Sequence, residues 1–380
     1  MKIGIVCYPT FGGSGVVATE LGKALAEKGH EVHFITYSQP ARLENFGKNL
    51  YFHEVNVLNY PLFQYPPYEL ALTSKLVDII KYEQLDLLHV HYAIPHAFAA
   101  FMAKQILETQ NYTIPIVTTL HGTDITLVGK DATYESAVTF SINKSDGVTA
   151  VSQYLKDATY SNFDIENDIE VIPNFLDLKV INKQEYPDFK ASIAANEEKI
   201  ISHISNFREV KRVEDVVRIF SEIRKNTQAK LVMVGDGPER ATAEKICRES
   251  PFCSDVQFLG KIDAVEKVLS ISDLFLLPSE TESFGLAALE AMACEVPVIA
   301  SNTGGLPEVI IDQKNGFTCD VGDVQTMTEK GLYLLQNEEL LSQFKKAAYE
   351  RAKSYDIHKI LPIYEDYYQT ILERIKITSP

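Results

Sequence analysis

A strand, a glycine-containing loop and a helix follow one another twice along this chain, and this alternation limits the folds open to it. The pattern first appears where the apolar stretch Ile3–Tyr8 leads into a glycine loop and a helical stretch that ends before Gly29. It restarts with the apolar stretch Lys199–Ser205. Strands that alternate with helices predict parallel sheets with helices on both faces. The chain is therefore expected to be an α/β protein.

The length of 380 residues favours two such sheets, because a single hydrophobic core stops growing at roughly 250–300 residues. We expect two Rossmann-like, doubly wound domains that face each other across a cleft, at 1–173 and 199–357, joined by a linker at 174–198. A C-terminal helix is predicted at about 358–380, and packing back on the first domain is one placement open to it. Short apolar stretches predict strands at 3–8, 32–36, 87–91, 116–120, 199–205, 231–234, 256–259, 274–277 and 296–300.

The charge balance narrows the range of partners. With 36 Lys and Arg against 52 Asp and Glu, the net charge is −16, which argues against general nucleic-acid binding and against docking on an anionic membrane. The chain opens on an apolar strand, without a signal segment or an apolar run of membrane-spanning length, which predicts a cytoplasmic protein. Its five cysteines include no C-x-x-C pair, so we expect buried thiols in a reducing compartment and no disulfide framework.

The loop Gly12-Gly13-Ser14-Gly15 is the first candidate site. Glycines let backbone N–H groups approach a phosphate, and the N-terminus of the following helix favours negative charge. Gly13 to Ala18 also fits the dinucleotide pattern G-x-G-x-x-A. However, the glycines come several residues after the strand, and the next strand ends in Thr36-Tyr37-Ser38 without an acid for a ribose. A phosphate loop, a plain turn and a nicotinamide site all stay open.

Two glutamates are the strongest local signal. Glu282 follows the apolar stretch 274–277, and Glu290 lies in the helix-forming run Ala287–Ala293. If the intervening stretch is mostly helical, a rise of roughly 1.5 Å per residue puts the carboxylates about 12 Å apart. That distance suits a nucleotide-sugar, with its diphosphate at the helix N-terminus and hydroxyls at either acid. The alternative is a solvated acid at a helix start followed by an exposed helix residue.

A short basic cluster follows the first strand of the second half. Arg208, Lys211 and Arg212 could neutralise the charge that develops on a leaving diphosphate. A solvated charge run at a helix start is the alternative. Because the chain has no Asp-x-Asp, a metal-dependent nucleotide-sugar site is not indicated.

Histidines stand near two strand ends of the first half. His121 follows the stretch 116–120 in a glycine loop, where it could contact a substrate or serve as a loop histidine with satisfied hydrogen bonds. His89, His91 and His96 could suggest zinc, but no nearby Cys or Glu completes a site. We therefore predict no metal.

In combination, these residues resemble the retaining nucleotide-sugar glycosyltransferases of family 4 over nearly the whole chain. The resemblance rests on four features: Gly12-Gly13, Arg208 with Lys211, the turn Gly235-Asp236-Gly237-Pro238, and the E-x7-E pair Glu282 and Glu290. It implies the GT-B fold, a nucleotide-sugar donor, retention of the α configuration and no cofactor. The family usually has a longer spacer and Lys-Gly in its basic motif, whereas here Arg212 follows Lys211. We prefer Lys211 as the second cation.

Longer phrases carry a narrower resemblance within the family: HVHYAIPHAFAA from His89, TTLHGTDITLVGKD from Thr118, IPNFLDL from Ile172 and SNFREVKRVEDV from Ser205. This resemblance is to the branch of the family that begins bacillithiol biosynthesis. It implies UDP-N-acetylglucosamine as the donor and L-malate as the acceptor, with N-acetylglucosaminyl-malate and UDP as products.

The resemblance also implies roles for individual residues. Those that hold the donor are Gly12, Gly13, Arg208, Lys211, Glu282, Phe284, Gly285, Leu286 and Glu290. Those implied in catalysis are His121, Arg208, Lys211 and Glu282. For the acceptor we nominate Tyr92, Thr119 and His121, since they stand at strand ends.

Other functions remain in competition. The same chemistry could serve another small soluble acceptor, such as a sugar or an inositol phosphate. A nicotinamide-dependent oxidoreductase and a nucleotide-sugar sensor without turnover are the remaining classes. A homo-oligomer is left open.

Overall fold

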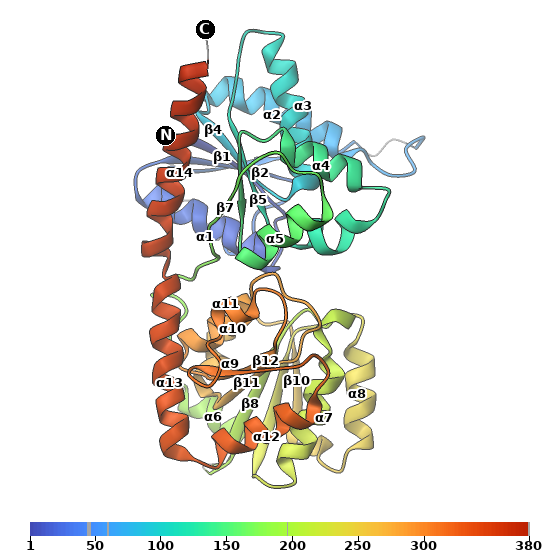
Figure 1. Ribbon diagram of the computed structural model, residues 1–380, viewed down its shortest axis with the longest axis vertical. Coiled ribbons are helices and arrows are strands. Elements are labelled where there is room, and N and C mark those ends of the chain that lie inside the picture. Colours follow the sequence, from blue (N-terminus) through green and yellow to red (C-terminus); the bar gives the residue numbers. More distant parts are fainter. Residues whose placement is uncertain (44–46, 59–60, 196, 379–380) are drawn as a thin grey trace. The chain divides into compact units, whose positions relative to one another are not determined.

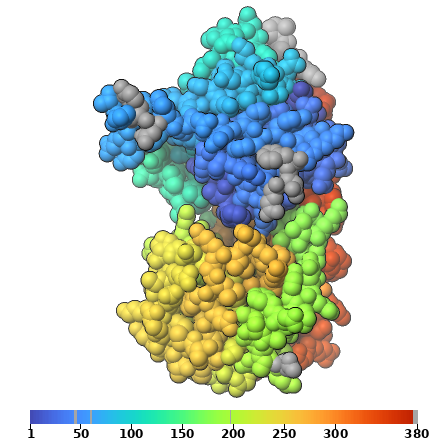
Figure 2. Space-filling view, turned by 180° about the vertical axis from the view of Figure 1, so that it is seen from behind, coloured from blue at the N-terminus to red at the C-terminus, as the bar shows by residue number. Residues whose placement is uncertain are grey.

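The computed structural model describes residues 1–378 except 44–46, 59–60 and 196, and it contains two compact units. Unit 1 comprises Met1–Phe175 with Ile357–Pro380, and unit 2 comprises Leu176–Asp356. Figure 1 shows a central sheet with helices around it in each unit. Unit 1 is built from both ends of the chain, and in Figure 2 red atoms of the C-terminal helix adjoin the blue atoms of the N-terminal segment.

Seven parallel strands form the sheet of unit 1 in the order β3-β2-β1-β4-β5-β6-β7. Their bounds are β1 (Lys2–Val6), β2 (Glu31–Thr36), β3 (Leu50–Glu54), β4 (Leu87–His91), β5 (Ile116–Leu120), β6 (Gly147–Ala150) and β7 (Ile169–Val171). The strand order reverses between β1 and β4, and such sheets bind ligands beyond the carboxyl ends of the strands at this point. The residues that follow β1 and β4 include Gly12 and Tyr92.

Helices cover this sheet. They are α1 (Gly13–Glu27), α2 (Tyr68–Glu83), α3 (Phe98–Glu108), α4 (Glu135–Asn143), α5 (Gln153–Asn162) and α14 (Ile357–Thr378), with short helical turns at Ala93–Ala97, Thr123–Leu127 and Val128–Lys130. α14 packs beside α1, and the hydroxyl of Tyr368 bonds the buried His89 at 2.7 Å. The last helix of the chain is therefore part of the core of unit 1.

Six parallel strands form the sheet of unit 2 in the order β10-β9-β8-β11-β12-β13. Their bounds are β8 (Lys199–Ile204), β9 (Ala229–Val234), β10 (Val256–Gly260), β11 (Leu274–Leu277), β12 (Val298–Ser301) and β13 (Gly316–Cys319). The order reverses between β8 and β11. The basic cluster and Glu282 follow these two neighbouring strands, so both lie at the switch point of this sheet.

The helices of unit 2 surround its sheet. They are α6 (Pro187–Ile193), α7 (Val213–Arg224), α8 (Arg240–Glu249), α9 (Val265–Ile271), α10 (Leu286–Ala293), α11 (Leu306–Val309), α12 (Val324–Leu335) and α13 (Glu338–Ala352), with 3-10 turns at Glu209–Lys211, Cys253–Asp255 and Lys353–Tyr355. α7 buries Val213, Val216 and Phe220 on one face, the spacing of an amphipathic helix on a core. Among the described residues, no helix combines the length and apolarity needed to cross a bilayer.

The predicted α/β alternation is confirmed, and β4, β5 and β11 have the predicted bounds. The apolar pattern does not reveal four strands, namely β3, β6, β7 and β13. β3 is an edge strand with exposed or half-exposed side chains, and the other three have only three or four residues, so none produces an apolar run. Strand pairing, rather than local sequence, stabilises these segments.

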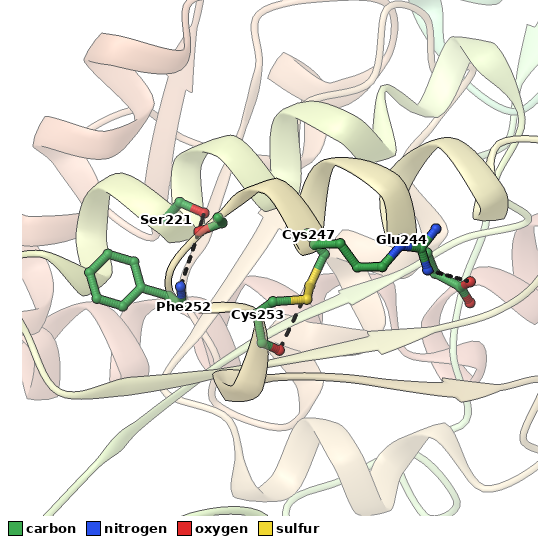
Figure 3. The surroundings of a disulfide bond; sticks show 7 residues. Ser221, Glu244, Cys247, Phe252 and Cys253 are labelled. Carbon is green, nitrogen blue, oxygen red and sulfur yellow. Dashed lines mark hydrogen bonds and ion pairs between the residues drawn. A yellow bond between two sulfur atoms is a disulfide. The ribbon is translucent and has the colours of Figure 1, made fainter.

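One disulfide corrects the prediction for the cysteines. Cys247, at the end of α8, is bonded to Cys253, with Cα atoms 5.0 Å apart (Figure 3). The turn after α8 brings the two sulfurs together, a geometry that their spacing of six residues does not reveal. The expectation of buried free thiols is confirmed for Cys7, Cys294 and Cys319.

Candidate active site

Three loops of unit 2 are joined at the carboxyl ends of neighbouring strands. The backbone N–H of Glu280, after β11, donates to the carbonyl of Val210, after β8, at 2.8 Å. The N–H of Gly305, after β12, donates to the carbonyl of Glu282 at 2.8 Å. Because β8, β11 and β12 are adjacent in the sheet, residues far apart in sequence form one surface here.

Lys211 and Glu282 form the centre of this surface. The Lys211 ammonium makes a close ion pair with the Glu282 carboxylate, and their side chains are only 19% and 13% exposed. Ser279 donates its hydroxyl to the same carboxylate at 3.1 Å. The structure thus brings together two residues predicted to hold the donor, and the ion pair keeps the acid and the cation at fixed positions beside the strand ends.

The two other cations of the basic cluster differ in their surroundings. Arg208 is exposed at the start of the 3-10 turn Glu209–Lys211. Arg212 has a left-handed backbone and bonds the buried Asp215 through its guanidinium Nε at 2.7 Å. Arg212 is thus paired with an acid of α7, whereas Lys211 is paired with Glu282, an acid predicted to hold the donor, so Lys211 stays the preferred cation beside Arg208.

The helix near Glu290 starts later than the spacing argument assumes. α10 begins at Leu286, so the stretch from Glu282 is helical only in its second half, and the value of about 12 Å along a helix axis does not apply. Gly285 caps the helix with a φ of +99°, which favours glycine. Glu290 is buried inside α10, at 7% exposure, and the alternative of an exposed helix residue is therefore wrong.

The side chains next to the start of α10 are packed against the core. Phe284 is 3% exposed, and its ring meets that of Tyr355 edge-on at 5.6 Å. The glycine turn after β12 supports the same segment. A Cβ on Gly304, whose φ is +60°, would lie 1.8 Å from the carbonyl oxygen of Glu282. Only glycine at that position allows the loop of Glu282 to approach so closely.

In unit 1, the glycine loop is continuous with its helix. α1 begins at Gly13, and Gly12 and Gly13 are exposed, so their backbone is open to solvent at the helix N-terminus. A Cβ on Gly15 would lie 2.3 Å from the carbonyl oxygen of Thr10. The last glycine of the loop is therefore required by close packing of the backbone. Tyr92, after β4, donates its hydroxyl to Ser14 at 2.8 Å and so joins the two loops at the switch point.

His121 lies among aromatic rings beside these loops. Its Nε2 is 2.8 Å from Nδ1 of His91, and its ring centroid is 5.2 Å from that of Tyr92. Burial lowers the pKa of His121 to about 3, so the imidazole is neutral at pH 7. The structure therefore places His121 and Tyr92, two of the predicted acceptor residues, in contact.

Thr119, the third residue nominated for the acceptor, has different surroundings. It lies within β5 with no exposed surface, and its hydroxyl bonds His89 and Thr149, each at 2.7 Å. Its side chain is enclosed by neighbouring strands because it precedes the strand end. The structure gives it a supporting position in the hydrogen-bond network, rather than the cleft-facing position that we predicted.

Two residues of this network have no predicted role. Asp124 is buried and accepts from the N–H groups of Ala93 at 2.9 Å and Gly122 at 3.1 Å, which ties the loops after β4 and β5 together. His91 contacts His121 directly. Asp124 stands three residues after His121 in the same loop. This short spacing could have indicated that the two residues belong to one site. The contact of His91 depends on strand register.

Comparisons with known proteins extend these observations. Residues 11–180 match the family description Glycosyltransferase Family 4, and residues 185–351 match Glycosyl transferases group 1. The N-acetyl-alpha-D-glucosaminyl L-malate synthase of Bacillus anthracis is 48% identical over 377 residues, which cover 98% of this chain and 97% of that protein. An uncharacterized glycosyltransferase of Methanocaldococcus jannaschii is 31% identical over 83% of this chain and 84% of its own length.

Solved structures share the fold. Sucrose-phosphate synthase from Thermosynechococcus elongatus matches 98% of this chain and 100% of its own, with a TM-score of 0.80 at 21% identity. Anabaena Alr3699/HepE, in complex with UDP and glucose, matches 97% of this chain and 99% of its own, with a TM-score of 0.80 at 19% identity. The chain therefore has the GT-B fold and belongs to glycosyltransferase family 4.

Proposed function

We propose that this enzyme transfers N-acetylglucosamine from UDP-N-acetylglucosamine to the hydroxyl of L-malate, releasing N-acetylglucosaminyl-malate and UDP. The observation that carries the proposal is the 48% identity, over nearly the full length of both chains, to a protein named N-acetyl-alpha-D-glucosaminyl L-malate synthase. The acidic net charge of −16 agrees with a small soluble acceptor.

In this proposal the surface of unit 2 holds the donor. Glu290 accepts hydrogen bonds from the ribose hydroxyls, and Glu282 accepts from the sugar hydroxyls. The backbone N–H groups of Phe284, Gly285 and Leu286, at the start of α10, hold the phosphate. The ion pair between Lys211 and Glu282 supports these roles, because it aligns a cation and an acceptor for adjoining parts of one nucleotide-sugar.

Charge neutralisation is the main chemical contribution of the protein. As the bond to the sugar breaks, negative charge grows on the diphosphate, and Arg208 and Lys211 stabilise it without a metal. The exposed N-terminus of α1, at Gly12 and Gly13, offers further N–H groups to the diphosphate. The acceptor hydroxyl attacks from the face that the diphosphate leaves, and a phosphate oxygen takes its proton, which retains the α configuration.

Residues of unit 1 hold the acceptor and the adjoining donor sugar. The neutral imidazole of His121, fixed by its bond to His91, can donate or accept one hydrogen bond without adding charge. Tyr92 lies beside it and bonds Ser14 of the glycine loop. We no longer assign Thr119 to the acceptor, because its hydroxyl bonds His89 and Thr149.

Release of UDP from UDP-N-acetylglucosamine, measured with and without L-malate, tests the proposal. We expect malate to raise UDP release in a saturable way and the product mass to match N-acetylglucosaminyl-malate. A parallel panel with simple sugars and inositol phosphates should show little product. If malate leaves UDP release unchanged over a wide concentration range, the acceptor assignment is wrong. Tight UDP binding without turnover would indicate a sensor instead.

A substitution at Glu290 tests the ribose contact. Glu290→Ala should weaken UDP binding by roughly 1–3 kcal/mol, since ribose hydroxyls would lose a carboxylate acceptor in a buried position. Calorimetric titration with UDP measures the loss, and a denaturant curve reports whether the variant is folded. Glu280→Ala, an exposed acid on the neighbouring loop, is the matched control and should bind UDP normally. Equal UDP affinity in Glu290→Ala and the native enzyme would contradict the role.

A further inference from the structure

Three side chains with metal-ligating atoms meet in unit 1, away from the loops described above. His33 lies on β2, His53 lies on the neighbouring edge strand β3, and Glu83 is the last residue of α2. His33 is near the amino end of β2, which begins at Glu31, whereas the candidate active site lies beyond the carboxyl ends of the strands. The cluster is therefore separate from the proposed reaction.

The ligand atoms of this cluster are close together. One imidazole nitrogen from each histidine and one carboxylate oxygen of Glu83 all lie within 4.8 Å of one another. Nδ1 of His33 is 2.9 Å from Nε2 of His53, and the two rings are stacked with centroids 5.2 Å apart. Three elements thus direct three potential metal ligands to one place, and the two imidazoles are hydrogen-bonded to each other there.

The second observation is an unsatisfied group. His33 is 1% exposed, and its Nε2 is buried without a hydrogen-bond partner among the described residues. A buried polar atom without a partner costs free energy, and a bound ion is one of the explanations for it.

The chemistry of the donors favours a particular class of ion. Two neutral imidazoles and one carboxylate are the ligand set of open tetrahedral zinc sites, in which water takes the fourth position. Burial lowers the pKa of His33 to about 4 and lowers that of His53, so both rings are neutral at pH 7 and can donate to a metal. Ligand atoms around zinc lie roughly 3.3 Å apart. The half-buried side chains of His53 and Glu83 have the freedom to close that difference.

We propose that His33, His53 and Glu83 form a binding site for one borderline divalent cation, of which zinc is the best fit. The ion would join the edge strand β3 to the end of α2 and so stabilise unit 1. Such an ion has no part in the transfer reaction, and the inference does not depend on the proposed function.

Zinc titration of the full-length enzyme, after treatment with a chelator, tests this proposal. We expect one equivalent of ZnCl2 to bind in a calorimetric titration and to raise the melting temperature. Cobalt, used in place of zinc, should produce the visible absorption of a tetrahedral site. His53→Gln and Glu83→Gln, both at half-buried positions, should each weaken zinc binding at least tenfold. His358→Gln, at an exposed histidine, is the control and should bind as the native chain does.

The outcomes separate this site from the other histidines of unit 1. If zinc fails to bind at micromolar concentration, the proposal is wrong. It is equally wrong if one equivalent binds but neither His53→Gln nor Glu83→Gln changes the affinity, because the ion would then lie elsewhere, for example near His91 and His96. Circular dichroism of both variants, compared with the native chain, ensures that a lost site is not a lost fold.

Discussion

Arg208→Ala should lower kcat by about 10²–10³-fold while changing UDP affinity far less. Arg208 is exposed beyond the end of β8, three residues before the Lys211 that pairs with Glu282, so its charge is available to a substrate. In the proposed reaction, negative charge on the diphosphate grows as the sugar leaves. An interaction that strengthens in the transition state contributes to kcat more than to ground-state binding.

Steady-state kinetics and a UDP titration on the same variant measure the two effects separately. Arg212→Ala is the matched control, because it removes the same side chain from the same loop but from a residue bound to Asp215. It should reduce the free energy of unfolding and change kcat only a few-fold. Equal losses in kcat and in UDP affinity for Arg208→Ala would contradict a role in the transition state.

Unit 1 should lose stability steeply as the pH falls below about 6.5. Burial lowers the pKa of His89 and His121 to about 3 and that of His96 to about 4. Unfolded histidine has a pKa of about 6.5, so the unfolded chain takes up protons that the folded chain refuses. Stability is complete above pH 6.5 and is lost as the pH falls toward the folded values. At pH 5, each of these histidines lowers the free energy of unfolding by about 2 kcal/mol.

Protonation of Asp124 changes the stability of unit 1 in the opposite direction. Burial raises its pKa to about 6, so the folded chain binds this proton more readily than the unfolded chain does. Between pH 7 and pH 5, protonation of Asp124 therefore raises the free energy of unfolding by about 1 kcal/mol. This gain is smaller than the loss caused by a single buried histidine. For these three histidines and Asp124 together, the expected loss is on the order of 5 kcal/mol at pH 5 relative to pH 7.5.

Urea unfolding at a series of pH values, followed by circular dichroism, measures this dependence. Hydrogen exchange in β4 would assign the loss to unit 1. His96→Phe should reduce the slope of unfolding free energy against pH by about one proton, because the ring of His96 packs on Tyr8 and its Nε2 is buried without a partner among the described residues. An unfolding free energy that is equal at pH 5 and pH 7.5 would contradict the argument.

Much of the fold follows from local pattern. The buried central strand β11 is a continuous apolar run because both of its faces are covered. β4 is equally buried, although it carries two histidines, and the bounds of both strands are predicted correctly. Edge and short strands escape this reasoning, as β3 does, because only pairing with a neighbour makes them strands.

In the candidate site, too, local sequence predicts some features and misses others. Local sequence correctly places Glu290 inside a helix, but it starts that helix too early, since α10 begins only at Leu286. It misplaces Thr119, because a hydroxyl one residue before a strand end is enclosed by the next strands. The contact between His91 and His121 escapes it as well, since strand register brings His91, the last residue of β4, beside His121, the residue that follows β5.

By itself, the sequence determined the α/β class, the two-sheet plan, the family and the residue types available for a nucleotide-sugar. These are properties of neighbouring residues, whose periodicity and spacing are readable along the chain. Only the tertiary structure decided that Lys211 meets Glu282, that Cys247 bonds Cys253, and that His33, His53 and Glu83 converge. Each of these contacts depends on side-chain directions set by strand order, turn geometry and helix packing, which no local pattern encodes.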